Sequence, residues 1–236
     1  MDISRKIFVS HEIINAIPPR ELRTVATGHG PLLAGVDLKE REIRLILNFA
    51  GKSHEHACEL ASAVAALFCT DEPGEYEPGK MPGRAFSAIL REAGDMEWHW
   101  GFGTVEYTFI APRPFSHSLA DTVVNASGAN IRIEPRGTVP VRPAIKHTMA
   151  AAAAALTFST GGSVFFRLRD PSGNDIPSGA VLTIDFENRK AMLNNQTNMT
   201  YVDYTASDWH PTILGGTTIV CSDVGDTEVR WRDEWM

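Results

Sequence analysis

The chain has few of the features that mark secreted or membrane proteins. It contains 3 cysteines in 236 residues, Cys58, Cys69 and Cys221, with no C-x-x-C spacing, so we expect plain reduced thiols. Its longest apolar tract, residues 149–156, is far below the roughly 20 residues that a membrane span needs. The N-terminus begins acidic and lacks the apolar segment of a secretory signal. The sequence therefore predicts a soluble protein, synthesised in the cytoplasm, with no membrane partner.

Basic charge is also scarce. The 22 Lys and Arg residues are outnumbered by 29 Asp and Glu residues, which leaves a net charge of −7. Specific nucleic-acid binding is not expected, because it needs a basic footprint that neutralises phosphates. A hydrophobic fraction of 43% nevertheless supplies a core and excludes wholesale disorder. The length suits one large domain or two of roughly 100–130 residues.

Hydrophobic periodicity predicts strands and a single helix in the first half. Residues 42–50 alternate, with Ile43, Leu45 and Leu47 on one face, as in a half-buried strand. Residues 53–69 carry apolar side chains at three- and four-residue steps, with Ser53 placed to cap the helix N-terminus. Further strands are predicted at residues 6–9, 22–26, 83–92, 97–99 and 103–112, with breaks at 15–19, 28–31 and 71–74.

The second half shows short strand-like runs and no long amphipathic helix. Such runs, separated by Gly, Asn and Pro, indicate a β-sandwich or barrel. We expect a polar connection between two domains at residues 116–128, giving an N-terminal domain of residues 1–120 and a C-terminal domain of residues 121–236. Six alanines at 150–155 favour a helix by propensity, but the run is short, and we favour strand or loop. The predicted strands are residues 131–134, 143–147, 156–159, 163–168, 181–185, 190–193, 217–221 and 228–231.

Neither a nucleotide site nor a metal site is predicted. The Gly101-Phe-Gly103 segment begins like a dinucleotide loop, but a strand follows it instead of a helix whose N-terminus would bind phosphate. His54 and His56 are two residues apart on the helix and do not face each other. His99 and His210 each lie beside tryptophan and are read as ordinary surface or edge histidines. We therefore expect no cofactor, no cofactor-binding residues and no metal ligands.

Acidic and aromatic clusters offer no convincing catalytic site. Asp71, Glu72, Glu75 and Glu77 lack the ligand ladder of an EF-hand loop and read as a solvated turn. Asp185 and Glu187 resemble a glycosidase carboxylate pair only by lying at alternate positions of a strand. G-x-S-x-G is absent, and a catalytic triad is recognised only from geometry. No catalytic residue is predicted, and the chain is not expected to be an enzyme.

Several segments, taken in order, resemble a known family. Residues 67–76 run from the helix into Asp71-Glu72-Pro73-Gly74-Glu-Tyr76, and a strand at 103–112 leads into Pro114-Phe115. The C-terminal half contains Leu182-Thr-Ile184-Asp185, Asn194-Asn195, Asp208-Trp209, Leu214-Gly215-Gly216 and a final Val229-Arg230-Trp231-Arg232. This order is similar to that of the distal tail proteins (Dit) of long-tailed phages of Gram-positive hosts. Gly216 and Asn195 differ from the family's usual letters, but Gly and Asn still suit tight turns.

The resemblance implies a mainly β protein of two sandwich- or barrel-like domains. The N-terminal domain, with its single helix, would form a hexameric ring that continues the tail tube, and the C-terminal domain would be galectin-like. The ring would join the tail tube protein to tail-associated or tip proteins, with a receptor-binding protein as a further candidate partner. DNA would pass through its lumen without specific binding. The implied location is the tail tip of the virion, and no catalytic residues are implied.

Two other functions remain open from the sequence. A carbohydrate-binding module of a host-adsorption device would use the galectin-like domain, with Trp209, Trp231 and Trp235 stacking on sugar rings. Against it, the galectin signature H-x-N-P-R is missing, and Trp231 also fits a buried last strand. An enzyme would require an exposed pocket that gathers His, Ser or carboxylate side chains within roughly 3 Å of one another.

Overall fold

The computed structural model describes residues 7–27, 30–99 and 102–236. The chain divides into two compact units, residues 1–117 with Met236, and residues 118–235. In both units the strands pair antiparallel, and the described residues contain a single α-helix. The predicted fold class, mainly β with one helix in two sandwich-like parts, is confirmed. The chain passes from the first unit to the second within β9 (Ser116–Ser118).

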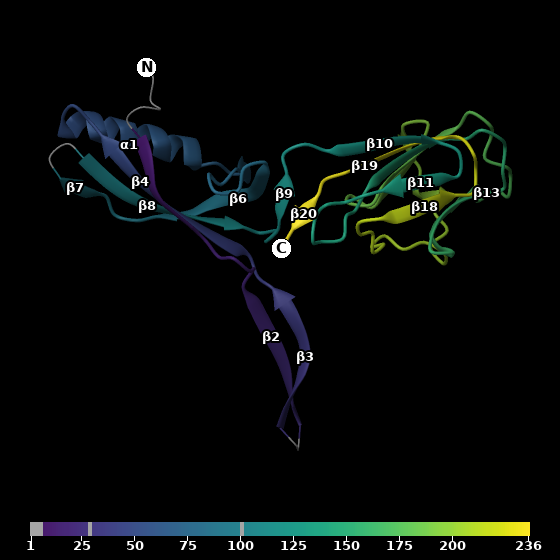
Figure 1. The fold of residues 1–236 in the computed structure, drawn as a ribbon, viewed down its shortest axis with the longest axis horizontal. Helices are drawn as coiled ribbons and strands as arrows, with labels where there is room; N and C mark the ends of the chain where they lie inside the picture. Colours follow the sequence, from purple (N-terminus) through teal and green to yellow (C-terminus); the bar gives the residue numbers. More distant parts are fainter. Residues whose placement is uncertain (1–6, 28–29, 100–101) are drawn as a thin grey trace. The chain divides into compact units, whose positions relative to one another are not determined.

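The first unit is built on an antiparallel sheet in the order β1-β4-β8-β6 (Figure 1). Helix α1 covers one face of this sheet, where alternate residues of β4, among them Ile43, Leu45 and Leu47, are buried against it. The alternation predicted for residues 42–50 is thus confirmed. The strands are β1 (Ile7–Ile14), β4 (Arg41–Ala50), β8 (Phe102–Ala111) and β6 (Arg84–Ala93), with β5 (Gly74–Tyr76) paired to β6 and β7 (Glu97–His99) paired to β8.

Helix α1 (His54–Phe68) begins and ends where its sequence predicts. The Ser53 hydroxyl accepts a hydrogen bond from the His56 N–H at 3.2 Å, which confirms the predicted N-cap. The Cys69 N–H donates to the Ala65 carbonyl at 2.9 Å and closes the last turn. Gly51 is needed just before the helix, because a Cβ there would lie 2.6 Å from the Ser53 carbonyl oxygen. The chain can therefore turn sharply from β4 into α1.

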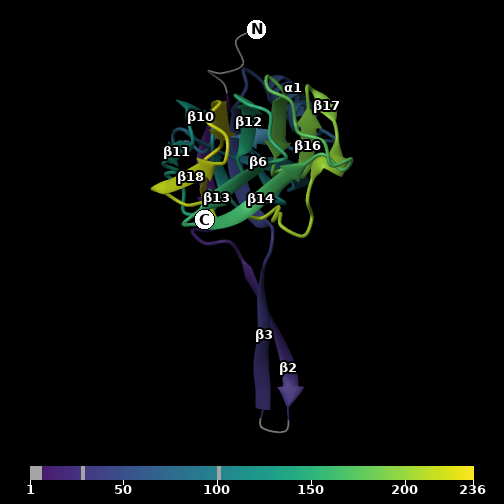
Figure 2. The same cartoon turned by 90° about the vertical axis from the view of Figure 1, so that its right-hand side faces the viewer.

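Strands β2 (Arg20–Thr27) and β3 (Gly30–Leu38) form a separate two-stranded hairpin that extends away from the sheet of the first unit (Figure 2). The predicted break at residues 28–31 is wrong in part, because Gly30 and Pro31 belong to β3. Gly28 and His29, like Lys6 at the predicted start of the first strand, lie outside the described residues. Strand β3 escaped prediction because a hairpin exposed on both faces has no core to impose alternation.

The second unit is a sandwich of two antiparallel sheets. Its 22-residue buried core draws on both sheets, and each of the eight strands predicted in this half is present. One sheet has the order β10 (Thr122–Ser127), β19 (Asp226–Trp231), β12 (Ala144–Thr148), β15 (Val181–Asp185), β16 (Lys190–Leu193) and β17 (Gln196–Thr197). The other has the order β11 (Asn130–Ile133), β18 (Thr217–Cys221), β13 (Ala155–Thr160) and β14 (Ser163–Arg169), and a 3₁₀ turn η1 (Met199–Tyr201) and β20 (Glu234–Trp235) complete the unit.

Three local predictions in the second half have clear outcomes. The polar segment 116–128 is not a plain connection, because it contains the mostly exposed edge strand β10. Residues 150–154 form no helix: Asp223 accepts the Ala150 N–H at 2.7 Å, and Ala153 and Ile176 exchange both backbone hydrogen bonds. Asn194 and Asn195 take positive φ values of 50° and 65° in the two-residue turn between β16 and β17, as their turn chemistry predicts.

Candidate functional site

The histidines and glycines singled out in the sequence do not come together as a site. The His54 ring packs edge-on against Trp98 with centroids 4.4 Å apart, whereas His56 Nδ1 accepts the Lys52 N–H at 3.1 Å. His210 Nε2 lies 2.9 Å from an Arg189 guanidinium nitrogen. Gly101 lies outside the described residues, and the segment after it forms the strand β8. In the ranges that the structure covers, no three His, Cys, Asp or Glu side chains are grouped to hold a metal ion.

The acidic residues considered above as catalytic or calcium-binding groups mostly lie in turns. Asp185 accepts hydrogen bonds from the backbone and side chain of Asn188, at 2.9 and 2.7 Å, and so closes the turn after β15. Glu77 accepts the Gly83 N–H at 2.8 Å. Asp71 and Glu72 are exposed. The predicted solvated acidic turn is thus present at Asp71 and Glu72, whereas Glu75 belongs to β5 and lies 3.4 Å from His117.

A buried polar cluster that the sequence analysis missed lies inside the second unit. His147 Nε2 is 3.0 Å from Asp223 Oδ2, and its Nδ1 is 2.8 Å from Thr227 Oγ1. If Nε2–H donates to the carboxylate, Nδ1 accepts the Thr227 hydroxyl proton and both ring nitrogens are satisfied. Cys221 Sγ lies 3.8 Å from both ring nitrogens. The only hint in the sequence was that His147 shares a strand face with Ile145.

The cluster resembles a catalytic triad in composition but cannot act as one. His147 is 0%, Cys221 1% and Thr227 2% exposed, so no substrate reaches them. Burial raises the pKa of the Cys221 thiol to about 11, which removes the thiolate needed for nucleophilic attack. The cluster instead fixes backbone: the Asp223 carboxylate accepts the N–H groups of Ala150 and Gly225 at 2.7 and 3.1 Å.

The tryptophans considered for sugar stacking are largely packed inside the second unit. Trp231 is 3% exposed and donates its indole N–H to Asp233 Oδ1 at 3.0 Å, as expected of a buried last strand. Trp209 packs edge-on against Phe166, with centroids 4.8 Å apart, and also contacts Phe186. Trp235 is half-buried. These side chains therefore do not form an exposed aromatic platform.

The sheet face of the first unit that α1 leaves open carries paired charges of both signs. Arg44 lies 3.4 Å from Glu42 and 3.6 Å from Glu106, and Arg91 lies 3.8 Å from Glu42. The Thr104 hydroxyl donates to the Asn48 side chain at 3.0 Å across β8 and β4. The carboxylates of Glu42 and Glu106 on this face therefore each lie close to a guanidinium group. We call this surface the open sheet face.

An apolar groove lies on the other side of the same sheet, beside α1. Its volume is about 510 Å³, and its walls come from β1, β4, β6, β8, β5 and the last turn of α1. Leu67, on its rim, is 71% exposed. At one end of the groove the Tyr76 hydroxyl donates a hydrogen bond to the Glu12 carboxylate. The pKa of Tyr76 is raised, mainly because the side chain is buried and secondly because of this hydrogen bond. Among the lining residues Glu75 is the one with a charged side chain.

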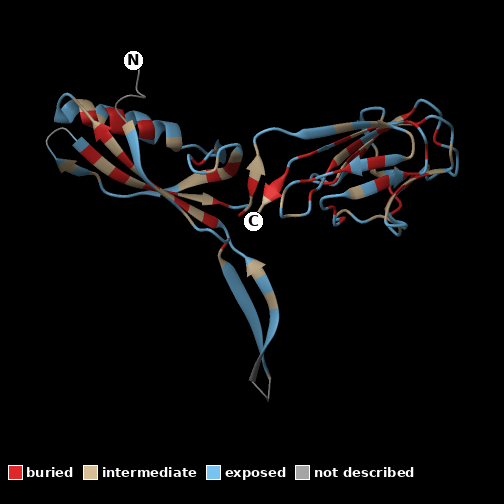
Figure 3. Cartoon of the chain, in the orientation of Figure 1, coloured by how far each residue is buried: buried red, intermediate tan, exposed pale blue. Residues whose placement is uncertain are grey.

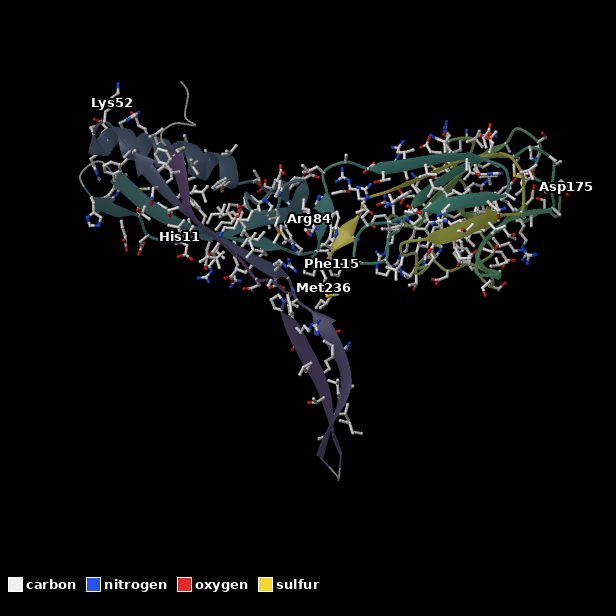
Figure 4. All side chains as sticks on the ribbon, in the orientation of Figure 1. His11, Lys52, Arg84, Phe115, Asp175 and Met236 are labelled. Atoms are coloured by element: carbon white, nitrogen blue, oxygen red, sulfur yellow. The ribbon has the colours of Figure 1, made fainter. Side chains whose placement is uncertain are left out.

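The hairpin β2–β3 is exposed along nearly its whole described length (Figure 3). Leu22 is 63%, Leu32 64% and Leu33 61% exposed, values typical of charged surface residues. Figure 4 shows its side chains standing out from the ribbon. A run of exposed large apolar side chains marks an interaction surface. The first unit thus carries two exposed apolar surfaces, the groove and the hairpin. The described residues contain no helix able to cross a bilayer.

The chain is similar to structural proteins of phage tails. Residues 136–235 match the family described as siphovirus-type tail component, C-terminal domain. The crystal structure of the SPP1 Dit protein, described as a paradigm of the hub adsorption apparatus in phages that infect Gram-positive bacteria, covers 100% of this chain and 96% of its own. The TM-score is 0.82 at 14% identity. The comparison with curated sequences gives no match.

A second solved structure agrees more weakly. A chain of the phage p2 baseplate, in its activated conformation with Sr, covers 98% of this chain and 92% of its own, with a TM-score of 0.52 at 9% identity. At such identities the likeness concerns the fold. The family match covers the part of the sandwich that follows β11, and the fold match extends over both units. Residues 136–235 therefore match the siphovirus-type tail component family, and the chain has the fold of the SPP1 Dit protein over its full length.

Proposed function

We propose that the chain is a hub of a long-tailed phage or prophage tail. Six copies form a ring at the tail tip of the virion, between the tail tube protein and the tip or baseplate proteins. The observation that carries the proposal is the Dit fold over the full chain, together with the family match of its second unit. Ring closure requires each copy to present two different patches, and the first unit supplies distinct apolar surfaces for them.

The open sheet face is the surface that we assign to the ring lumen. A lumen that passes DNA must avoid gripping phosphates, and clustered unpaired Arg or Lys side chains would grip them. Here Arg44 and Arg91 lie within 3.8 Å of Glu42 or Glu106, so their positive charge is locally compensated. The net charge of −7 supports the same function.

The proposed ring is tested by measuring the molecular mass of the assembly that the purified chain forms. Mass photometry over a concentration series should show a species of six times 25.9 kDa, about 155 kDa, and negative-stain microscopy should show rings with a central hole. If only the 25.9 kDa monomer is found at every concentration, and no rings are seen, the proposal fails.

The lumen assignment predicts a gain of DNA binding. Glu42→Lys combined with Glu106→Lys leaves Arg44 and Arg91 without their carboxylates. In a gel-shift assay with short linear duplex DNA, wild-type rings should give no shift at physiological salt. Rings of the variant should shift the duplex in a salt-sensitive manner. Asp226→Lys with Glu228→Lys, on β19 of the second unit, is the matched control for the change of charge; equal DNA binding by both variants would contradict the assignment.

A further inference from the structure

The hairpin β2–β3 is amphipathic around its base and apolar towards its tip. Cross-strand pairing places Leu22 opposite Val36 and Thr24 opposite Leu33 on one face. The other face carries charge near the base, where Arg23 Nε lies 2.7 Å from Asp37 and Lys39 pairs with Glu21. Beyond these pairs, residues 24–36 contain no Asp, Glu, Lys or Arg. The outer half of the hairpin is therefore suited to burial against an apolar surface.

The hairpin cannot reach the groove of its own chain. Its base is fixed by the Lys39 N–H, which donates to the Pro19 carbonyl at 2.9 Å, and by the Arg23–Asp37 and Lys39–Glu21 pairs. Pro18 and Pro19 restrict the entry, and only Lys39 and Glu40 separate β3 from β4. The hairpin extends away from the sheet that forms the groove (Figure 2). Burial of both surfaces therefore requires a second molecule.

The groove matches the hairpin in chemistry. Its apolar walls include Ile7 and Val9 of β1, Leu67 and Phe68 of α1, and Leu90 of β6. Strand β1 is the edge of its sheet, so backbone groups on its outer side can pair with an added strand. The outer half of the hairpin brings no Asp, Glu, Lys or Arg into the groove, and Glu75, the lining residue with a charged side chain, already lies 3.4 Å from His117.

One chain thus carries two different surfaces that can join neighbouring copies head to tail. We propose that the outer half of the β2–β3 hairpin of one copy lies in the α1–β1 groove of the next copy around the ring, an inference that rests on the proposed ring. The outer half includes four residues of β2, 24–27, which span about 13 Å. One of its faces is smaller than the roughly 800 Å² per partner of a stable interface, so the hairpin is one part of the contact between copies.

The test joins the two surfaces chemically within the full chain. Exposed Cys69 and half-buried Cys58 are first replaced by serine, and Leu33→Cys is combined with Leu67→Cys. A short bismaleimide cross-linker should then give a ladder of denaturation-resistant species up to six chains. The matched control combines Leu33→Cys with Val123→Cys, because Val123 is 44% exposed on β10 of the second unit. The control should remain single chains.

The outcomes distinguish failure of the hairpin–groove contact from failure of the proposed ring. Rings without a ladder, or with an equal ladder in the control, overturn the hairpin contact and leave the ring standing. Linkage within single chains overturns it as well, because the hairpin then occupies its own groove. Absence of rings from the unmodified chain contradicts the proposed function. As an independent check, Leu33→Asp should raise the concentration for half-assembly at least tenfold, whereas Val123→Asp should leave it unchanged.

Discussion

At the scale of single residues, the buried cluster around His147 shows how polar groups organise the second unit. Asp223 accepts two backbone N–H groups and faces the His147 ring, so one carboxylate joins β12 to the loop that follows it. Gly225 lies so close that a Cβ on it would be 1.9 Å from the Thr148 carbonyl oxygen. These contacts explain why six alanines in a row do not form a helix.

Removal of the Asp223 carboxylate should destabilise the second unit. Asp223→Ala leaves His147 and two backbone donors without their acceptor, at a cost of roughly 3 kcal/mol in free energy of unfolding. Urea unfolding followed by tryptophan fluorescence, to which the buried Trp231 contributes, measures it. Asp226→Ala, which removes an exposed carboxylate bonded to Ser127, is the control and should change stability by less than about 0.5 kcal/mol.

The same substitution predicts a pH dependence. Burial acts to raise the pKa of Asp223, but the bonds from Ala150, His147 and Gly225 outweigh it, so the pKa lies below its ordinary value of 3.8. The stabilisation is thus present above pH 3.8 and is lost as the pH falls through the lowered pKa. The difference between wild type and Asp223→Ala should shrink below that pH. A difference that stays constant through this range would contradict the account.

At the scale of elements, helix α1 depends on its N-terminal cap. Ser53→Ala removes the acceptor of the His56 N–H and should cost about 1 kcal/mol. Hydrogen exchange at the α1 amides measures this loss within the intact chain. Ser62→Ala, at an exposed position in the middle of the helix, is the control and should be neutral or slightly stabilising. Equal losses in the two variants would show that the Ser53 cap contributes nothing.

The sequence predicted those elements whose pattern is imposed by a core. The alternation of β4, the period of α1 and the positive-φ turn at Asn194 and Asn195 are local consequences of burial and backbone sterics. Strands β3 and β10 were missed because their mostly exposed side chains carry little pattern. The His147 cluster was missed because Asp223 and Thr227 lie 76 and 80 residues away in the chain. The hairpin and groove required pairing and exposure that only the fold supplies.

At the scale of the whole molecule, the two units have different properties. The second unit buries a core of 22 residues between two sheets and matches the tail-component family. The first unit has 12 buried core residues and exposes an apolar hairpin, an apolar groove and an edge strand. Exposure of such apolar surfaces to water is unfavourable in free energy unless another molecule covers them. We infer that assembly depends chiefly on the first unit.

The most direct test of the proposed hub is a cryo-electron microscopy reconstruction of the purified full chain. We predict a closed ring of six copies, with the face that carries Arg44, Glu42 and Glu106 lining the central hole. A ring with a different number of copies would contradict the hexamer. A reconstruction in which this face is covered by a neighbouring copy, or lies on the outside, would contradict its assignment to the lumen.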